Sequence, residues 1–319
     1  MEKTISIKKN LIIAVLLMLS MAALFLFYRL GNNWEFVLQL RSVKVIAILM
    51  VAVSVAYSSV AFQTLTNNRI LTPSIMGFES LYLLIQTLIV YMYGDETYKV
   101  LSSMDNFLFS VIGMIGFGLL LYFMINKKGK DNIYLLILVG IILGTLFSSL
   151  SSFMQLLIDP NDFFIVQGKM FATFNKINTD LLWPSSIILI IILFFGFRMT
   201  KYLDVIALGR EHAINLGLNY NGLVKQFLVI IAILVSISTA LVGPVTFLGL
   251  LVTNLTFELY KTHKHSIIIA ACFIVSAIAL LAGQFIMERI LNLSTPLSAI
   301  INMVGGLYFI YLLLKVRKL

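Results

Sequence analysis

The sequence predicts an all-α, polytopic membrane protein with about ten transmembrane helices in a single domain over residues 1–319. Three observations lead to this fold class. Of the residues, 60% are hydrophobic and 12% charged, with a mean hydropathy of +1.01, which excludes a water-soluble globule. Apolar runs long enough to cross about 30 Å of hydrocarbon recur along the chain. The basic residues cluster between these runs and form no continuous patch, so no nucleic-acid partner is expected.

Nine apolar runs are long, and a tenth over residues 245–259 is short and contains Asn254. Counting ten spans places most Lys and Arg residues, including Lys127, Lys128 and Lys130, on the cytoplasmic side, as the positive-inside rule requires. Both termini are then expected in the cytoplasm, at a cell membrane. The long runs cover residues 11–30, 43–62, 75–93, 107–125, 133–158, 182–197, 225–242, 266–287 and 296–314.

The first run also resembles a signal peptide, with a basic start and small residues over 20–23. No small-x-small cleavage site follows, and the run continues to Leu30. We therefore expect a retained helix.

Two proline turns precede spans three and eight. Pro73 follows a polar turn expected at the cytoplasmic face, and Pro244 opens the short span at the outer face. Elements that run in opposite directions at equivalent positions are typical of inverted repeats, in which interrupted helices mark a transport pathway.

Polar residues within the spans allow two interpretations each. An ionisable side chain costs roughly 2.5–3.5 kcal/mol at the centre of a transmembrane helix. Glu79 lies about one turn into span three, and Gln86 follows on the same face. Both residues either hydrogen-bond a neighbouring helix or line a polar path. In span five, small residues recur every four positions and require close packing against another helix, either within the chain or at a subunit interface. These residues are Gly140, Gly144, Ser148 and Ser152, with Gln155 one turn further on.

The cytoplasmic segment 198–225 is expected to form two short amphipathic helices with a glycine turn. These two helices are too short to cross the membrane. The segment either lies in the headgroup layer or forms a docking element for a cytoplasmic partner protein.

Catalytic and metal-binding roles have little support in the sequence. The single cysteine, Cys272, and the three histidines lack the spacing of metal ligands. Neither GxSxG, HExxH nor GxxxxGK[ST] occurs, so no catalytic residue, metal or cofactor is expected in this chain. An ion-coupled secondary transporter stays an alternative, although it would need more buried acids than Glu79. An intramembrane enzyme is a second, weaker one.

Three stretches resemble a known family, the permease subunits of ATP-binding-cassette importers for iron–siderophores, haem and cobalamin. They are LDVIALGREHAINLGLN from Leu203, VGPVTFLGLLVTNL from Val242, and Gln63 with NNRILTPSIMG from Asn67. The resemblance covers nearly the whole chain and implies the inverted-repeat type II importer fold. Thr253-Asn254 replaces the family's usual proline-histidine, which favours a branch that serves ferric catecholate-type siderophores over a cobalamin transporter.

The resemblance also implies roles for particular residues and partners. Spans five and ten would line the translocation path or dimer interface, with Ser148, Ser152, Gln155, Ser298 and Asn302 at or near it. ATP and Mg²⁺ would bind to cytoplasmic ATPase subunits. A second permease, identical or homologous, and an extracytoplasmic siderophore-binding protein would complete the complex in the lipid bilayer. The residues implied to couple to the ATPase are Leu208, Gly209, Arg210, Glu211, His212, Ala213, Leu216 and Gly217.

Overall fold

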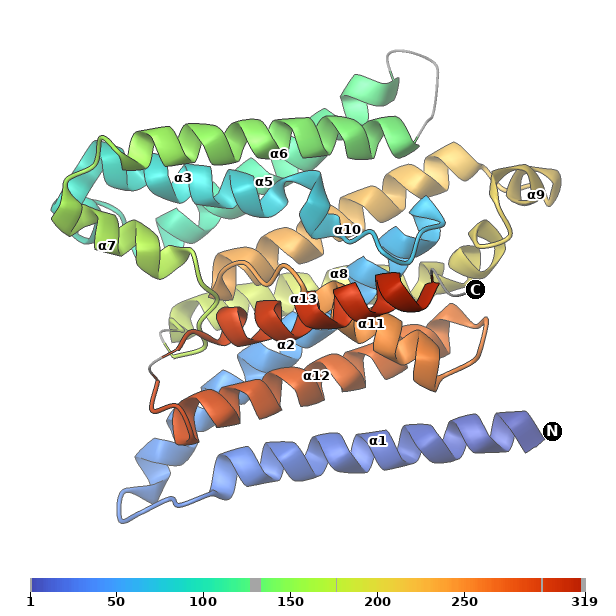
Figure 1. Cartoon of the computed structure of the whole chain (residues 1–319), viewed down its shortest axis with the longest axis horizontal. Helices are drawn as coiled ribbons and strands as arrows, with labels where there is room; N and C mark the ends of the chain where they lie inside the picture. The colour runs from blue at the N-terminus through green and yellow to red at the C-terminus, as the bar shows by residue number, and fades with distance from the viewer. Residues whose placement is uncertain (1, 127–132, 176, 294, 317–319) are drawn as a thin grey trace.

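The computed structural model describes residues 2–126, 133–175, 177–293 and 295–316, and these ranges contain helices and no β-strand (Figure 1). Lys127, Lys128 and Lys130, which supported the orientation, lie outside the described residues. The elements are α1 (Glu2–Phe27), α2 (Trp34–Thr66), η1 (Pro73–Met76), α3 (Phe78–Tyr93), η2 (Gly94–Glu96), α4 (Thr97–Val100), α5 (Ser103–Asn126), α6 (Ile133–Gln155), α7 (Pro160–Lys169), α8 (Thr179–Ile206), α9 (Arg210–Asn215), α10 (Tyr220–Val242), α11 (Leu248–Leu259), α12 (His265–Arg289) and α13 (Leu297–Val316).

The ten predicted spans each correspond to one helix. Among the described residues, seven helices are long and apolar enough to cross a membrane, and α3, α11 and α13 are shorter apolar helices. The chain is therefore a multi-pass membrane protein. The 16 residues of α3 and the 12 of α11 extend only about 24 and 18 Å at 1.5 Å per residue. Both are shorter than the hydrocarbon core, so the segment before each one must complete its crossing.

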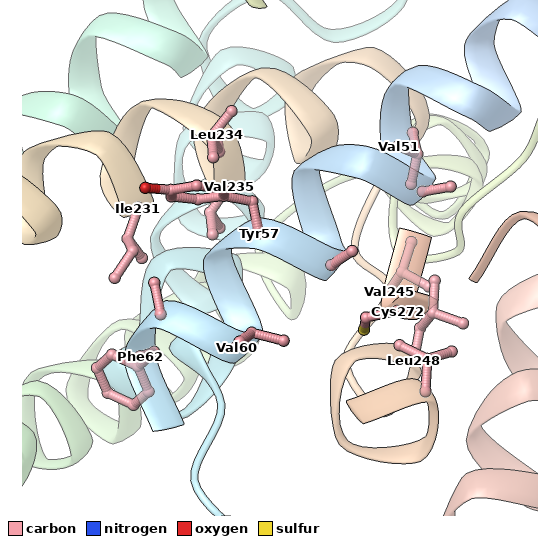
Figure 2. Packing of buried hydrophobic residues seen from close by; sticks show 14 of the residues in the cluster. Val51, Tyr57, Val60, Phe62, Ile231, Leu234, Val235, Val245, Leu248 and Cys272 are labelled. Atoms are coloured by element: carbon pink, nitrogen blue, oxygen red, sulfur yellow. The ribbon is translucent and has the colours of Figure 1, made fainter. Parts of the chain in front are cut away.

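Helix α2 forms the centre of the bundle and is buried along most of its length. It packs most extensively against α12 and α10, and several of its buried residues are alanines, which let neighbouring backbones approach closely. Figure 2 shows Tyr57 of α2 beside Leu234 and Val235 of α10. The Tyr57 hydroxyl donates to the Gly196 carbonyl oxygen of α8 at 2.9 Å, at a point where a larger residue than glycine would collide with the ring.

Helix α1 lies at the edge of the bundle and packs on α12. Only 6% of its most apolar stretch is buried inside the structure, as expected for a surface that faces lipid. The Arg41 guanidinium of α2 donates to the carbonyl oxygens of Leu26 at 2.9 Å and Tyr28 at 2.7 Å. These bonds satisfy carbonyl groups that the end of α1 leaves unpaired, so they fix α1 to the rest of the fold.

The fifth predicted span ends earlier than expected, at Gln155, and a separate helix follows. Asp159 accepts a hydrogen bond from the Asn161 N–H and Pro160 occupies the first helical position, so α7 begins here. In Figure 1, α7 lies at the opposite end of the bundle from α9, whereas the start of α1 and the end of α13 lie at the same end as α9. The bundle therefore has one end with both described termini and α9, and another with α7.

Candidate functional site: an internal helix junction and an exposed knob

The two proline turns meet inside the bundle. Gly77 begins α3 with a φ of +85°, and Gly243 begins the segment before α11 with a φ of +101°. Figure 1 shows α3 in the half of the bundle toward α7 and α11 in the half toward α9. The expectation that the turns lie at opposite membrane faces is therefore wrong. Each turn lies inside the bundle because the helix that follows it, about 24 Å long for α3 and about 18 Å for α11, is shorter than a full span.

The Glu79 carboxylate joins these turns. Its Oε1 accepts from the Ser74 hydroxyl at 2.8 Å, and its Oε2 accepts from the Thr246 hydroxyl at 2.6 Å. Helix N-termini carry partial positive charge, and Glu79 lies in the first turn of α3 and contacts the segment that opens α11. The carboxylate thus has hydrogen-bond partners and a favourable helix dipole within the membrane.

This geometry favours the structural interpretation of Glu79 over path lining. A cavity of about 30 Å³ beside Glu79 is lined by hydroxyl-bearing side chains from α2 and α10, which is room for about one water molecule. Ser74 and Thr246 were missed in the sequence. The available signal was a hydroxyl residue one or two positions after each proline.

The small-residue face of α6 packs against the turn before α3. A Cβ on Gly144 would lie 2.9 Å from the Gly77 Cα, and one on Gly140 would lie 3.0 Å from the Met76 Cα. The interpretation of packing within the chain is therefore confirmed for Gly140 and Gly144. Further along, the Ser148 hydroxyl donates to the Ser80 hydroxyl at 3.0 Å, and Ser152 is exposed.

Two sets of side-chain hydrogen bonds hold α3 to its neighbours near the α7 end of the bundle. The Gln86 amide is buried and donates to Asn106 Oδ1 at 2.7 Å and Ser110 Oγ at 2.9 Å, both on α5. The Gln155 amide of α6 donates to the Thr87 hydroxyl of α3 at 3.3 Å. These side chains are partnered between helices of the same chain.

The two predicted residues of α13 have different surroundings. Ser298 is buried and accepts from the Ala172 N–H at 3.1 Å, which ties the start of α13 to the segment after α7. Asn302 is partly exposed, although its side-chain oxygen is buried and has no hydrogen-bond partner among the described residues. Apolar side chains stay exposed along both α6 and α13, the two helices assigned to the path or dimer interface.

Part of the segment 198–225 forms a compact knob, which we define as residues 207–218. Gly209 and Gly217, with φ values of +100° and +84°, bracket the six-residue helix α9. Ala213 is fully buried and anchors the knob, and its carbonyl oxygen accepts from the Leu218 N–H at 3.1 Å. The Arg210 guanidinium lies over the Tyr220 ring at 5.9 Å. Glu211 and His212 are exposed.

Apolar side chains project from this knob. Leu208 is 58% exposed, Ile214 48% and Leu216 63%. The expectation of two short helices is wrong, because α8 continues to Ile206 and leaves only α9 as a separate helix. No glycine or proline interrupts α8 between residues 198 and 206, and Leu203 and Ile206 are buried on this part of the helix.

Comparison with known proteins shows which family this chain is similar to. Residues 4–315 match the model of the FecCD transport family. The chain is 56% identical over 295 residues to the petrobactin import system permease protein YclO of Bacillus subtilis (strain 168), covering 92% of this chain and 93% of the relative. It is 36% identical to the petrobactin import system permease protein FatC of Bacillus anthracis, covering 89% and 80%.

A solved structure of a metal-chelate type ABC transporter in an inward-facing conformation has the same fold. Its TM-score is 0.85 at 21% identity, with 97% of this chain and 99% of the other covered. The fold and the family match over nearly the whole length agree with each other. The chain belongs to the FecCD transport family.

Proposed function

We propose that this chain is the transmembrane permease subunit of an ATP-driven importer for ferric siderophores. The observation that carries the proposal is the knob of residues 207–218, which presents Leu208, Ile214 and Leu216 to solvent beyond the end of the helix bundle. Exposed apolar side chains on a short, anchored helix fit a groove on a partner protein. The partner is a cytoplasmic ATPase subunit, and both termini lie on its side of the cell membrane.

The relatives support the substrate class. Two of them, at 56% and 36% identity, are named as petrobactin import permeases, so ferric petrobactin is the first substrate to test. The catecholate-type class expected from the sequence stays a prediction. An extracytoplasmic binding protein delivers the siderophore, and a second permease, identical or homologous, forms the other wall of the path.

Transport follows alternating access. Closure of the ATPase dimer on ATP and Mg²⁺ moves the knob, and the helices around the path tilt in response. The permease supplies no catalytic group and holds no cofactor in this scheme. Helix α3 and the segment that opens α11 are joined at Glu79, and this junction keeps the two halves of the subunit together while the surrounding helices change their tilt.

An ion-coupled secondary transporter is the alternative, and uptake measurements separate the two. Vesicles that contain the complex and radiolabelled ferric petrobactin are expected to lose uptake when ATP is depleted and to keep it when an ionophore collapses the ion gradient. The reverse result would favour the secondary transporter. Glu79 offers this alternative little support, because both of its oxygens already accept hydrogen bonds.

Substituting exposed side chains of the knob tests docking without changing the backbone of the knob. Leu208→Asp and Leu216→Asp, singly and together, are expected to reduce co-purification of the ATPase by at least about tenfold, because a charge would be buried in an apolar groove. Ile290→Asp is the control, because Ile290 is 65% exposed at the end of α12 away from the knob. Normal ATPase recovery with the double variant would refute the docking proposal.

A further inference from the structure

A hydrogen-bonded chain links the root of the knob to two other helices. Asp204 lies in α8, two residues before that helix ends and the knob begins. Its Oδ1 accepts from the backbone N–H of His265 at 2.7 Å and is 2.7 Å from His265 Nδ1. On the other side of the ring, His265 Nε2 is 2.9 Å from the Thr64 hydroxyl in the last turn of α2. The three residues come from three different helices.

The donor in the first of these bonds can be assigned. A carboxylate only accepts hydrogen bonds, so the Nδ1 of His265 donates to Asp204. The Thr64 hydroxyl lies within hydrogen-bond distance of both His265 Nε2, at 2.9 Å, and the Val60 carbonyl oxygen, at 2.8 Å. Each ring nitrogen of His265 therefore contacts a different helix. His265 is 5% exposed, which shields the bonds from competing water.

Asp204 has a second role at the same point. His265 is the first residue of α12, and the preceding residue, Lys264, provides no side-chain cap. The Asp204 carboxylate supplies that cap from another helix, where it also faces the positive end of the α12 dipole. The end of α8 is thereby held to the start of α12 by two hydrogen bonds on one oxygen.

The bridge continues into the rest of the core through α2. The Gln63 amide, adjacent to Thr64, donates to the Thr253 hydroxyl of α11 at 2.8 Å. The cytoplasmic end of α2 is thus bonded both to the α8–α12 pair and to α11. Because α2 packs against α10, α11 and α12, a displacement of its end reaches most of the bundle.

We infer that Asp204, His265 and Thr64 form a bridge that passes movement of the knob to α2. The inference rests on the proposed function, because only a moving knob makes the bridge a transmission element. All three are positioning residues: they contact neither ATP nor siderophore. Without the bridge, the knob can still dock and the ATPase can still hydrolyse ATP, but less of the movement reaches the helices around the path.

The experiment uses the complete complex in proteoliposomes, with ferric petrobactin as the probe. It measures ATPase co-purification, ATP hydrolysis, and siderophore imported per ATP. His265→Asn keeps an amide group near the Nδ1 position and His265→Gln keeps one near Nε2, so each variant preserves one half of the bridge. Both are expected to import roughly tenfold less siderophore per ATP with normal co-purification, a loss within the usual range of coupling between sites.

Matched controls separate transmission from folding. His263 is an exposed histidine that lines a cavity of about 300 Å³ together with Asp204 and His265. His263→Asn and His263→Gln are expected to behave as wild type. Thr64→Val removes only the hydroxyl and should lower import per ATP, whereas Thr64→Ser keeps the hydroxyl and should import as the wild type does. If the His265 variants fail to fold, the Thr64 pair decides the question.

Two results would overturn the inference. One is unchanged import per ATP in His265→Asn, His265→Gln and Thr64→Val. The other is an equal loss of co-purification, hydrolysis and import, which indicates a structural role only. A wild-type chain that does not bind the ATPase would refute the proposed function itself, and the bridge with it.

Discussion

Glu79→Ala is expected to remove most folded protein from the membrane. The substitution leaves the hydroxyls of Ser74 and Thr246 without their acceptor. An unsatisfied buried donor costs about 1–3 kcal/mol, so the combined loss is about 2–6 kcal/mol. This loss is a large part of the stability of a typical folded protein, which is about 5–15 kcal/mol. The measurements are the recovery of monodisperse protein in detergent and its thermal unfolding midpoint.

Two further variants test this explanation. Glu79→Gln retains an acceptor and is expected to lose less stability than Glu79→Ala. Glu35→Ala is the matched control, because Glu35 also lies in the first turn of a helix but is exposed. If Glu79→Gln folds normally while siderophore uptake disappears, Glu79 acts in the path and the structural interpretation is wrong.

Gly144→Leu is expected to separate α6 from the turn before α3. Even the first added carbon would lie 2.9 Å from the Gly77 Cα, which belongs to the backbone and cannot move aside as a side chain can. Overpacking of this kind costs typically 1–3 kcal/mol or more, and close backbone packing is a main source of helix association in membranes. We expect a loss of about 3 kcal/mol, measured as a lower unfolding midpoint.

Gly116→Leu on α5 provides the comparison, since a side chain there meets open space. It should fold as the wild type does. Equal stability of the Gly144 and Gly116 variants would show that the contact between α6 and the turn does not hold the two elements together. Gly77→Ala should be as damaging as Gly144→Leu, because Gly77 combines the same clash with a φ of +85°.

Much of the fold follows from the sequence alone, because the bilayer thickness fixes how long an apolar run must be. The ten runs therefore correspond to ten helices, including the short one over residues 245–259 that hydropathy alone would leave in doubt. The glycine-bracketed knob was also recognisable, since Gly209 and Gly217 interrupt a segment with apolar residues. The spacing of Gly140 and Gly144 predicted a close helix contact without naming the partner.

Only the tertiary structure decided how these elements meet. A run of apolar residues does not show which distant turn a helix end will contact, so the junction of α3 and α11 at Glu79 was not predictable. His265 lies 61 residues from Asp204 and 201 from Thr64. Hydrogen bonds between such distant positions leave no periodic signal, because they depend on how whole helices pack and not on local spacing.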